Sequence, residues 1–129
     1  MTNTNKLLQA IYDGIYEKLG NNVVNMDFSK LGNTVTDHFV ICDAQSDRQV
    51  KAIADSVEEF AFKQAGEKVV HVEGTDNSQW VLLDFTDVIV HIFQTEYRPF
   101  YNLEALWADA EISHIPVPQS PISRLNEKN

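Results

Sequence analysis

Residues 35–42 read Val-Thr-Asp-His-Phe-Val-Ile-Cys, and Ser46-Asp47-Arg48-Gln49 follows close behind. The first segment is rich in β-branched and aromatic residues, which predicts a strand. Ser46 stands where a helix N-cap would be, and Gln49 stands at the capping-box spacing from it. The apolar stripe behind this box predicts a helix over 47–65 that stops at Gly66. The stretch therefore predicts a strand followed directly by a helix.

The rest of the chain supplies the neighbours of this strand and helix. The hydrophobic patterns predict a helix over 5–19, strands over 22–28, 68–73, 80–84 and 88–93, and a helical stretch that opens at Arg98-Pro99. The last two strands are joined by Phe85-Thr86-Asp87 as a hairpin, and the second is apolar on both faces, as in a sheet interior. The predicted order is α-β-β-α-β-β-β-α, an α/β fold of the mixed α+β kind with a five-stranded mixed sheet flanked by helices.

Length and composition set the domain organisation. The chain has 129 residues, which is the size of one domain. Neither a G-x-G-x-x-G loop nor a Walker loop is present in the sequence, so a doubly wound nucleotide fold is not expected. We place the domain at 1–110. Prolines 116, 118 and 121 interrupt regular structure beyond it, so 111–129 is predicted to be an extended or mobile tail.

Charge and cysteine content narrow the function. Ten Lys and Arg stand against nineteen Asp and Glu, for a formal net charge of -9 at pH 7. This balance argues against a protein held mainly by phosphate contacts, and it suits a basic protein as partner. The single cysteine, Cys42, rules out a multi-cysteine zinc site and an internal disulfide, which favours a reducing, cytoplasmic location. We expect neither a membrane span nor a signal peptide.

Several polar side chains are candidates for chemistry. The four histidines, His38, His71, His91 and His114, include no pair at the spacing of a zinc protease. We favour histidines hydrogen-bonded in or beside the sheet over a metal site built from distant strands, so no metal ligand is assigned. The enzyme alternative is a metal-dependent nucleotidyltransferase or hydrolase that uses Asp37, Asp43, Asp84 and Asp87. Asp84 and Asp87 flank the hairpin turn, where Asp is a common turn residue. We place Asp37 within the second strand and Asp43 just after it, and either carboxylate needs a partner if it faces the core. Cys42 is expected to be a buried structural thiol, and Ser46 a cap with no nucleophile elbow around it.

Aromatic residues are concentrated in the last third of the domain: Trp80, Tyr97, Phe100, Tyr101 and Trp107. Trp80 opens a strand after a polar loop, where it can stand at a sheet edge. Tyr101 and Trp107 differ by six positions and so point to different faces of a helix. We expect Phe100 and Trp107 to lie in the core. The remaining aromatics would form an exposed face of the kind that anchors protein interfaces.

The sequence closely resembles the ribosomal silencing factor family, also called RsfS or Iojap-like. The motifs that carry the resemblance are Thr36-Asp37-His38-Phe39-Val40-Ile41-Cys42, Ser46-Asp47-Arg48-Gln49-Val50, Ala52-Ile53-Ala54, Gly66-Glu67-Lys68, Val72-Glu73-Gly74, the run from Trp80 to His91, and Phe100-Tyr101-Asn102-Leu103-Glu104-Ala105-Leu106-Trp107. They occur in the family's order over about residues 5–108. Asn102 stands where the family often has Asp.

The resemblance implies an adaptor and not a catalyst. Family members bind the large ribosomal subunit through a basic ribosomal protein of the L14 type on its subunit-joining face, which blocks joining with the small subunit and lowers translation when nutrients are short. Organellar relatives assist ribosome assembly, so a large-subunit assembly factor is the alternative of the same class. The family fold is related to that of nucleotidyltransferases, without their activity, and homodimers are associated with the family. The resemblance implies no cofactor, no metal and no membrane or direct nucleic-acid dependence.

The partner-binding residues that the resemblance implies lie on the hairpin and the last helix. They are Trp80, Leu82, His91, Tyr101, Leu103, Glu104 and Leu106. Trp80 and Tyr101 would be the anchors, and Glu104 would pair with a Lys or Arg of the partner. Blocking by occupation of a shared face would require no conformational switch.

Overall fold

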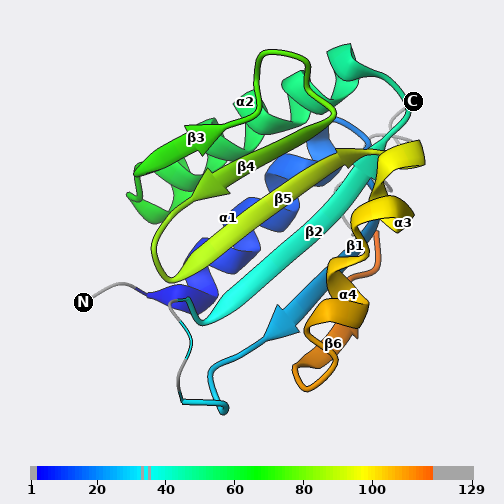
Figure 1. Cartoon of the computed structure of the whole chain (residues 1–129). Helices are drawn as coiled ribbons and strands as arrows, with labels where there is room; N and C mark the ends of the chain where they lie inside the picture. Colours follow the sequence, from blue (N-terminus) through cyan, green and yellow to red (C-terminus); the bar gives the residue numbers. More distant parts are fainter. Residues whose placement is uncertain (1–2, 33, 35, 118–129) are drawn as a thin grey trace.

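The computed structural model describes residues 3–32, 34 and 36–117, which form a mixed sheet with two long helices on one face and two short helices on the other (Figure 1). The strand order is β3-β4-β5-β2-β1-β6. The elements are α1 Thr4–Glu17, β1 Asn21–Asp27, β2 His38–Ala44, α2 Asp47–Ala65, β3 His71–Glu73, β4 Trp80–Asp84, β5 Val88–Gln94, the 3-10 turn η1 Thr95–Tyr97, α3 Arg98–Tyr101, α4 Leu103–Leu106 and β6 Glu111–His114. The mixed α/β class is therefore confirmed.

The β2–α2 unit has the local signals that the sequence predicts. Helix α2 has the predicted bounds, the Oγ atom of Ser46 accepts from the Gln49 backbone N–H at 3.1 Å, and Gly66 ends the helix with φ of 68°. The predicted second half of the capping box is absent. The side-chain amide of Gln49 instead donates to the carbonyls of Lys18 and Leu19, at 3.2 Å each. It thereby ties the start of α2 to the end of α1.

Helices α1 and α2 pack tightly on each other and on one sheet face. A Cβ atom added at Gly14 would stand 2.9 Å from the Cα of Val57, so the glycine permits the close crossing. The buried hydroxyl of Ser56 donates to the Gly14 carbonyl at 2.7 Å. Helix α1 begins after its cap Asn3 and ends at Glu17, two residues before the predicted end. Leu19 therefore lies outside the helix, with a positive φ of 61° and an exposed side chain.

The sheet has six strands where the sequence predicts five. Strand β6 pairs antiparallel with β1, with Ile112 opposite Met26 and Ser113 opposite Asn25. The prediction of an extended or mobile tail is therefore wrong for 111–114. Residues 111–114 form a strand because the edge of β1 has unpaired backbone N–H and C=O groups that require hydrogen-bond partners. A segment of four residues is too short for its hydrophobic pattern to predict this pairing. Residues 118–129 of the predicted tail, and residue 35 of the predicted second strand, lie outside the described residues.

Other strand ends differ from the predicted ones. Strand β2 begins at His38 and continues to Ala44, so Asp43 lies inside it and Asp37 precedes it, the reverse of the prediction. Strand β3 is confined to 71–73 rather than 68–73. Strand β2 runs parallel to β5 and antiparallel to β1, which places it at the centre of the sheet.

The predicted C-terminal helix is two short helices separated at Asn102, whose φ of 46° is left-handed. The assignment of Phe100 and Trp107 to the core is wrong, since 79% of Phe100 and 40% of Trp107 are exposed. Leu103 is the residue of this segment that is buried. The break at Asn102 turns α4 relative to α3, so a single helical periodicity through both cannot identify the inward side chains.

Candidate functional site

The candidate site is the sheet face that α1 and α2 do not cover. Side chains alternate between the faces of a strand. In β4, Val81 and Leu83 therefore join the core beneath the helices, while Trp80 and Leu82 face the other way. In β5, His91 lies opposite Leu82 in the register. Three of the predicted partner-binding residues are thus brought to one face by two adjacent strands.

Trp80 and His91 are joined by a hydrogen bond. The indole Nε1–H donates to the imidazole Nδ1 at 3.0 Å, so Nδ1 is the acceptor and Nε2 carries the proton. His91 is only 3% exposed, and burial lowers its pKa to about 3. Within the described part of the chain, its Nε2 has no hydrogen-bond partner. The ring of Phe39 contacts the imidazole edge-on, with centroids 4.4 Å apart.

Tyr101 completes an aromatic cluster with Trp80. The two ring centroids are 4.6 Å apart, and the Trp80 ring also stacks on Phe93 at 5.1 Å. Tyr101 is exposed, whereas Phe93 is buried. We call the set of exposed and partly exposed side chains formed by Trp80, Leu82 and Tyr101, together with Leu106 of α4, the docking patch. Leu106 is 69% exposed.

Leu103 and Glu104, which the sequence predicts to bind a partner, do not present free side chains on this surface. Leu103 is buried in the small core beneath α4 with Met26 and Phe93, so it anchors the segment and does not present a surface. Glu104 is only partly exposed, and its Oε2 accepts from Nη2 of Arg98 at 2.9 Å. The structure therefore gives Glu104 a partner within its own chain.

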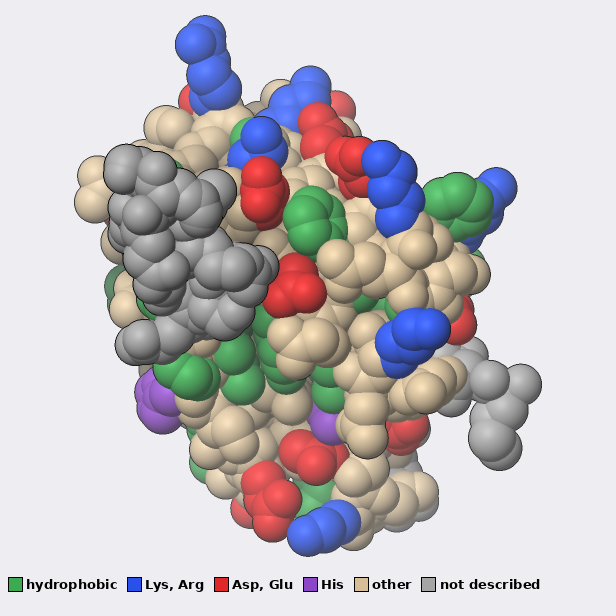
Figure 2. Space-filling view, turned by 180° about the vertical axis from the view of Figure 1, so that it is seen from behind, with side chains coloured by type: hydrophobic (Ala, Val, Ile, Leu, Met, Phe, Trp, Pro, Cys, Tyr) green, Lys and Arg blue, Asp and Glu red, His purple; other side chains and the backbone are tan. Residues whose placement is uncertain are grey.

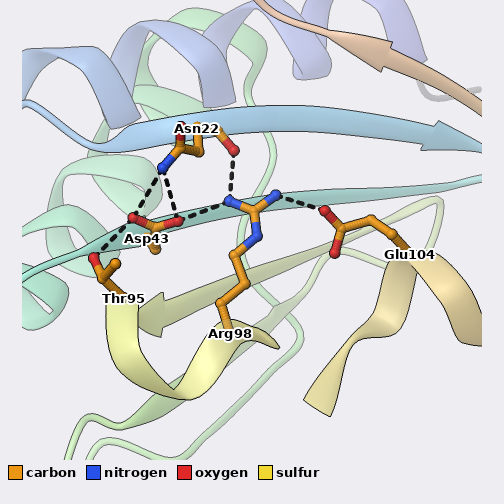
Figure 3. A network of polar contacts seen from close by, with 5 residues as sticks. All are labelled: Asn22, Asp43, Thr95, Arg98 and Glu104. Carbon is orange, nitrogen blue, oxygen red and sulfur yellow. Dashed lines mark hydrogen bonds and ion pairs between the residues drawn. The ribbon is translucent and has the colours of Figure 1, made fainter. Parts of the chain in front are cut away.

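A polar network links the segment from η1 to α4 to the sheet (Figure 3). The buried Asp43 carboxylate accepts from Thr95 Oγ1 at 2.9 Å, from Arg98 Nη1 at 2.9 Å, and from the Asn22 side-chain amide at 3.3 and 3.5 Å. Arg98 Nη1 also donates to the Asn22 carbonyl at 2.6 Å. These side chains and Glu104 line a hollow of about 390 Å³. The buried Asp43 carboxylate thus has the hydrogen-bond and ion-pair partners that compensate for its burial.

Sequence reasoning missed Arg98 and Asn22 as functional residues. The signal that pointed toward them was Asp43, a carboxylate next to an apolar strand that needs a partner if it is buried. Nothing in the spacing indicates which cation, 55 residues further along the chain, would supply that partner.

The four carboxylates of the enzyme alternative do not meet. Asp43 is near the C-terminal end of β2 and is bound to Arg98, whereas Asp37 lies before the start of that strand. Asp84 Oδ1 accepts from the Thr86 backbone N–H at 2.7 Å, which is a turn role. Asp37 and Asp87 are neighbours through their backbones, where the Asp37 N–H donates to the Asp87 carbonyl at 3.0 Å. Among the described residues, no three His, Cys, Asp or Glu side chains are grouped so as to hold a metal ion.

The remaining candidates for chemistry, Cys42 and three of the histidines, lie in surroundings that fit a structural role. Cys42 is buried, and burial raises the pKa of its thiol above the ordinary range, as predicted for a structural cysteine. His38 Nδ1 lies 3.0 Å from Asn25 Oδ1, and His71 pairs with Glu73 at 2.7 Å. His114 lies in edge strand β6. In the described ranges, no helix is both long and apolar enough to cross a bilayer.

Comparison with known proteins places this chain in one family. The family model described as "Ribosomal silencing factor during starvation" matches residues 1–129. The chain is 35% identical over 113 residues to "Ribosomal silencing factor RsfS" of Bacillus subtilis, covering 88% of this chain and 94% of the relative. It is 32% identical over 74 residues to mouse "Mitochondrial assembly of ribosomal large subunit protein 1", covering 56% of this chain and 32% of that protein. The crystal structure of protein CV0518 from Chromobacterium violaceum superposes with a TM-score of 0.74 at 31% identity, covering 91% of this chain and 96% of that one. The chain therefore belongs to the ribosomal silencing factor family.

Proposed function

We propose that this chain is a cytoplasmic, ribosome-associated regulator that binds the large subunit through a basic ribosomal protein and blocks joining with the small subunit. The names of its family and of its relatives support the ribosomal role. The observation that carries the proposal is the pairing of Trp80 with exposed Tyr101 on the sheet face that α1 and α2 do not cover. Tryptophan and tyrosine side chains are enriched among the residues that contribute most of the binding energy of protein interfaces.

The aromatic chemistry of the patch fits a macromolecular partner better than a small substrate. Trp80 uses its indole N–H on His91, so it presents ring surface and not a hydrogen-bond donor. Such surface is worth the most when a partner excludes water from it. We expect truncation of Trp80 or Tyr101 to cost about 2 kcal/mol or more of binding free energy each.

The charge of the chain supports a basic partner. With a net charge of -9, long-range attraction would raise the rate of encounter with a positively charged ribosomal protein. Figure 2 shows charged side chains of both signs on the side of the molecule opposite to that of Figure 1, with hydrophobic side chains between them. In this proposal the docking patch makes the contacts with the partner, and the negative charge of the chain raises the rate of their association.

Silencing by this route needs no catalysis and no change of shape. A bound protein that occupies a face required by the small subunit excludes that subunit by volume alone. A homodimer is a further part of the proposal. Light scattering of the purified chain over a range of concentrations tests it, because a stable dimer keeps its mass on dilution.

A second candidate function is assembly of the large subunit. It is favoured by the name of the mouse relative, which refers to assembly of the mitochondrial large subunit. This function requires binding to precursor particles and the accumulation of immature large subunits when the protein is removed. Silencing requires binding to mature subunits and leaves their composition unchanged.

A sucrose-gradient assay tests the proposal. Purified large and small subunits are mixed with the wild-type chain, with a Trp80→Ala, Tyr101→Ala double variant, or with Phe62→Ala. Phe62 is an exposed aromatic residue of α2, on the helical side, and serves as the matched control. We expect the wild type and the control to sediment with large subunits and to reduce joined ribosomes, and the double variant to do neither. A wild-type chain that stays at the top of the gradient would refute the proposal.

A further inference from the structure

The segment that presents half of the docking patch has few attachments of its own. Helices α3 and α4 have four residues each, far below the length at which a helix is stable alone. Leu103 is their single buried residue, while Tyr101 and Leu106 are exposed. Ring contacts of Trp107 with Phe28 and of Tyr101 with Phe93, at centroid distances of 5.4 and 5.8 Å, add to Leu103. The position of Tyr101 against Trp80 therefore depends on contacts with the sheet and not on the short helices themselves.

Arg98 supplies a further attachment. Its guanidinium donates to three separate elements: the Asn22 carbonyl of β1, the Asp43 carboxylate of β2, and the Glu104 carboxylate of α4. The side chain of Arg98 is only 12% exposed, and that of Asp43 is buried (Figure 3). Water therefore competes weakly for these hydrogen bonds, and charged partners make them stronger than neutral ones.

The backbone at both ends of the bridge is shaped to receive it. Asn22 has a positive φ of 53° at an irregularity in the pairing of β1 with β2, and its carbonyl accepts from Arg98. Asn102, also at positive φ, makes the turn that brings Glu104 of α4 back toward Arg98. A planar fork with donors in several directions fits three acceptors that a lysine ammonium on a single flexible stem cannot span together.

We propose that Arg98 is the positioning residue of the docking patch, and that Glu104 acts through Arg98 and not through an ion pair with the partner. Arg98 fixes the α3–α4 segment on the end of the sheet, which holds Tyr101 beside Trp80 and turns Leu106 outward. Its effect on binding rests on the proposed function. Its effect on the order of 98–107 is a property of the chain alone.

A double-mutant cycle with Arg98→Lys and Glu104→Met tests this role. Arg98→Lys keeps a cation next to buried Asp43, so the sheet retains its charge balance, but it breaks the bridge to Glu104. Glu104→Met removes the carboxylate and leaves the Arg98–Asp43 pair intact. Lys63→Met is the matched control, because it removes the exposed Glu59–Lys63 ion pair of α2, far from the segment.

The first measurement is amide hydrogen exchange of the full chain without ribosomes. We expect both single variants to exchange faster at Asn102, Leu106 and Trp107, whose N–H groups bond within the segment, and unchanged exchange in β2 and β5. Lys63→Met should match the wild type. Unchanged exchange over 98–107 in both single variants would overturn the proposal.

The second measurement is affinity for purified large subunits. We expect each single variant to bind about tenfold more weakly, and the double variant to be no weaker than either within about twofold, as for residues that act as one unit. Losses that multiply in the double variant would mean that Glu104 contacts the partner directly, which overturns its assigned role. If Arg98→Lys also loosens β2 and β5, Glu104→Met alone decides by the same two measurements. If the wild type does not bind large subunits, the proposed function fails, while hydrogen exchange still decides the positioning role.

Discussion

The indole Nε1–H of Trp80 donates a 3.0 Å hydrogen bond to Nδ1 of His91, across the antiparallel pair β4–β5. This bond fixes the orientation of the Trp80 ring in the docking patch and selects the imidazole tautomer that holds its proton on Nε2. A histidine that the sequence placed among partner contacts is thus buried beneath the patch. It supports Trp80 from within the chain.

Burial of His91 makes stability depend on pH in a defined direction. Its pKa falls from 6.5 to about 3 on folding, so between these values the unfolded chain binds more protons than the folded chain. The stabilisation that folding gains from keeping His91 neutral is therefore complete at pH values well above 6.5, and it is lost as the pH falls toward 3. Lowering the pH from 6.5 to 5 should remove about 2 kcal/mol of folding free energy through this residue.

Urea unfolding of the wild type and His91→Gln at pH 7 and pH 5 measures this contribution. Glutamine can still accept from the indole but does not titrate in this range. We expect a smaller loss of stability between the two pH values for the variant. Equal losses in both proteins would show that His91 is not the titrating group.

Leu103 and Leu106 lie on the same short helix but should respond differently to truncation. Leu103→Ala leaves a cavity in the small core and should lower the free energy of unfolding by about 2 kcal/mol or more. Leu106→Ala removes an exposed side chain and should change stability by less than about 0.5 kcal/mol while it weakens binding to large subunits. Chemical denaturation and subunit binding, measured on both variants, separate the two roles. Equal destabilisation by both would contradict the assignment.

Gly14 should not tolerate alanine, although alanine favours helices. The added Cβ would lie 2.9 Å from the Cα of Val57, so α1 and α2 would have to move apart. We expect Gly14→Ala to destabilise the chain by about 1–3 kcal/mol, because overpacking outweighs the gain of about 1 kcal/mol in helix propensity. The melting temperature should fall. A rise would mean that the two helices can separate without loss of packing.

Strand β6 should be required for full stability. A chain that ends at Ala110 lacks the hydrogen bonds of β6 to β1, and it lacks Ile115, whose carbonyl accepts from the Tyr16 hydroxyl of α1. We expect it to be less stable than a chain that ends at Val117 by about 2 kcal/mol or more, since each lost hydrogen bond contributes about 1 kcal/mol. Denaturant midpoints of the two chains provide the comparison. Identical midpoints would support the sequence-based domain limit at residue 110.

Local signals account for the elements that sequence analysis placed correctly. Helix α2 has the predicted bounds because Ser46 and Gly66 satisfy its ends with atoms close by in the chain, and β4 has the predicted bounds because its residue types favour a strand. The family motifs also brought Trp80, Leu82, His91 and Tyr101 into one candidate site, and the structure places these four together.

By itself, the sequence determined the mixed α/β class, the β2–α2 unit, the acidic character and the aromatic residues of the patch, because composition, caps and periodicity are properties of neighbouring residues. Tertiary structure alone decided that β6 completes the sheet, that Phe100 is exposed while Leu103 is buried, and that Arg98 joins Asn22, Asp43 and Glu104. Each of these depends on a free strand edge, a turn at Asn102 or a buried charge whose partner lies far along the chain. These features form only when the helices and strands have packed together.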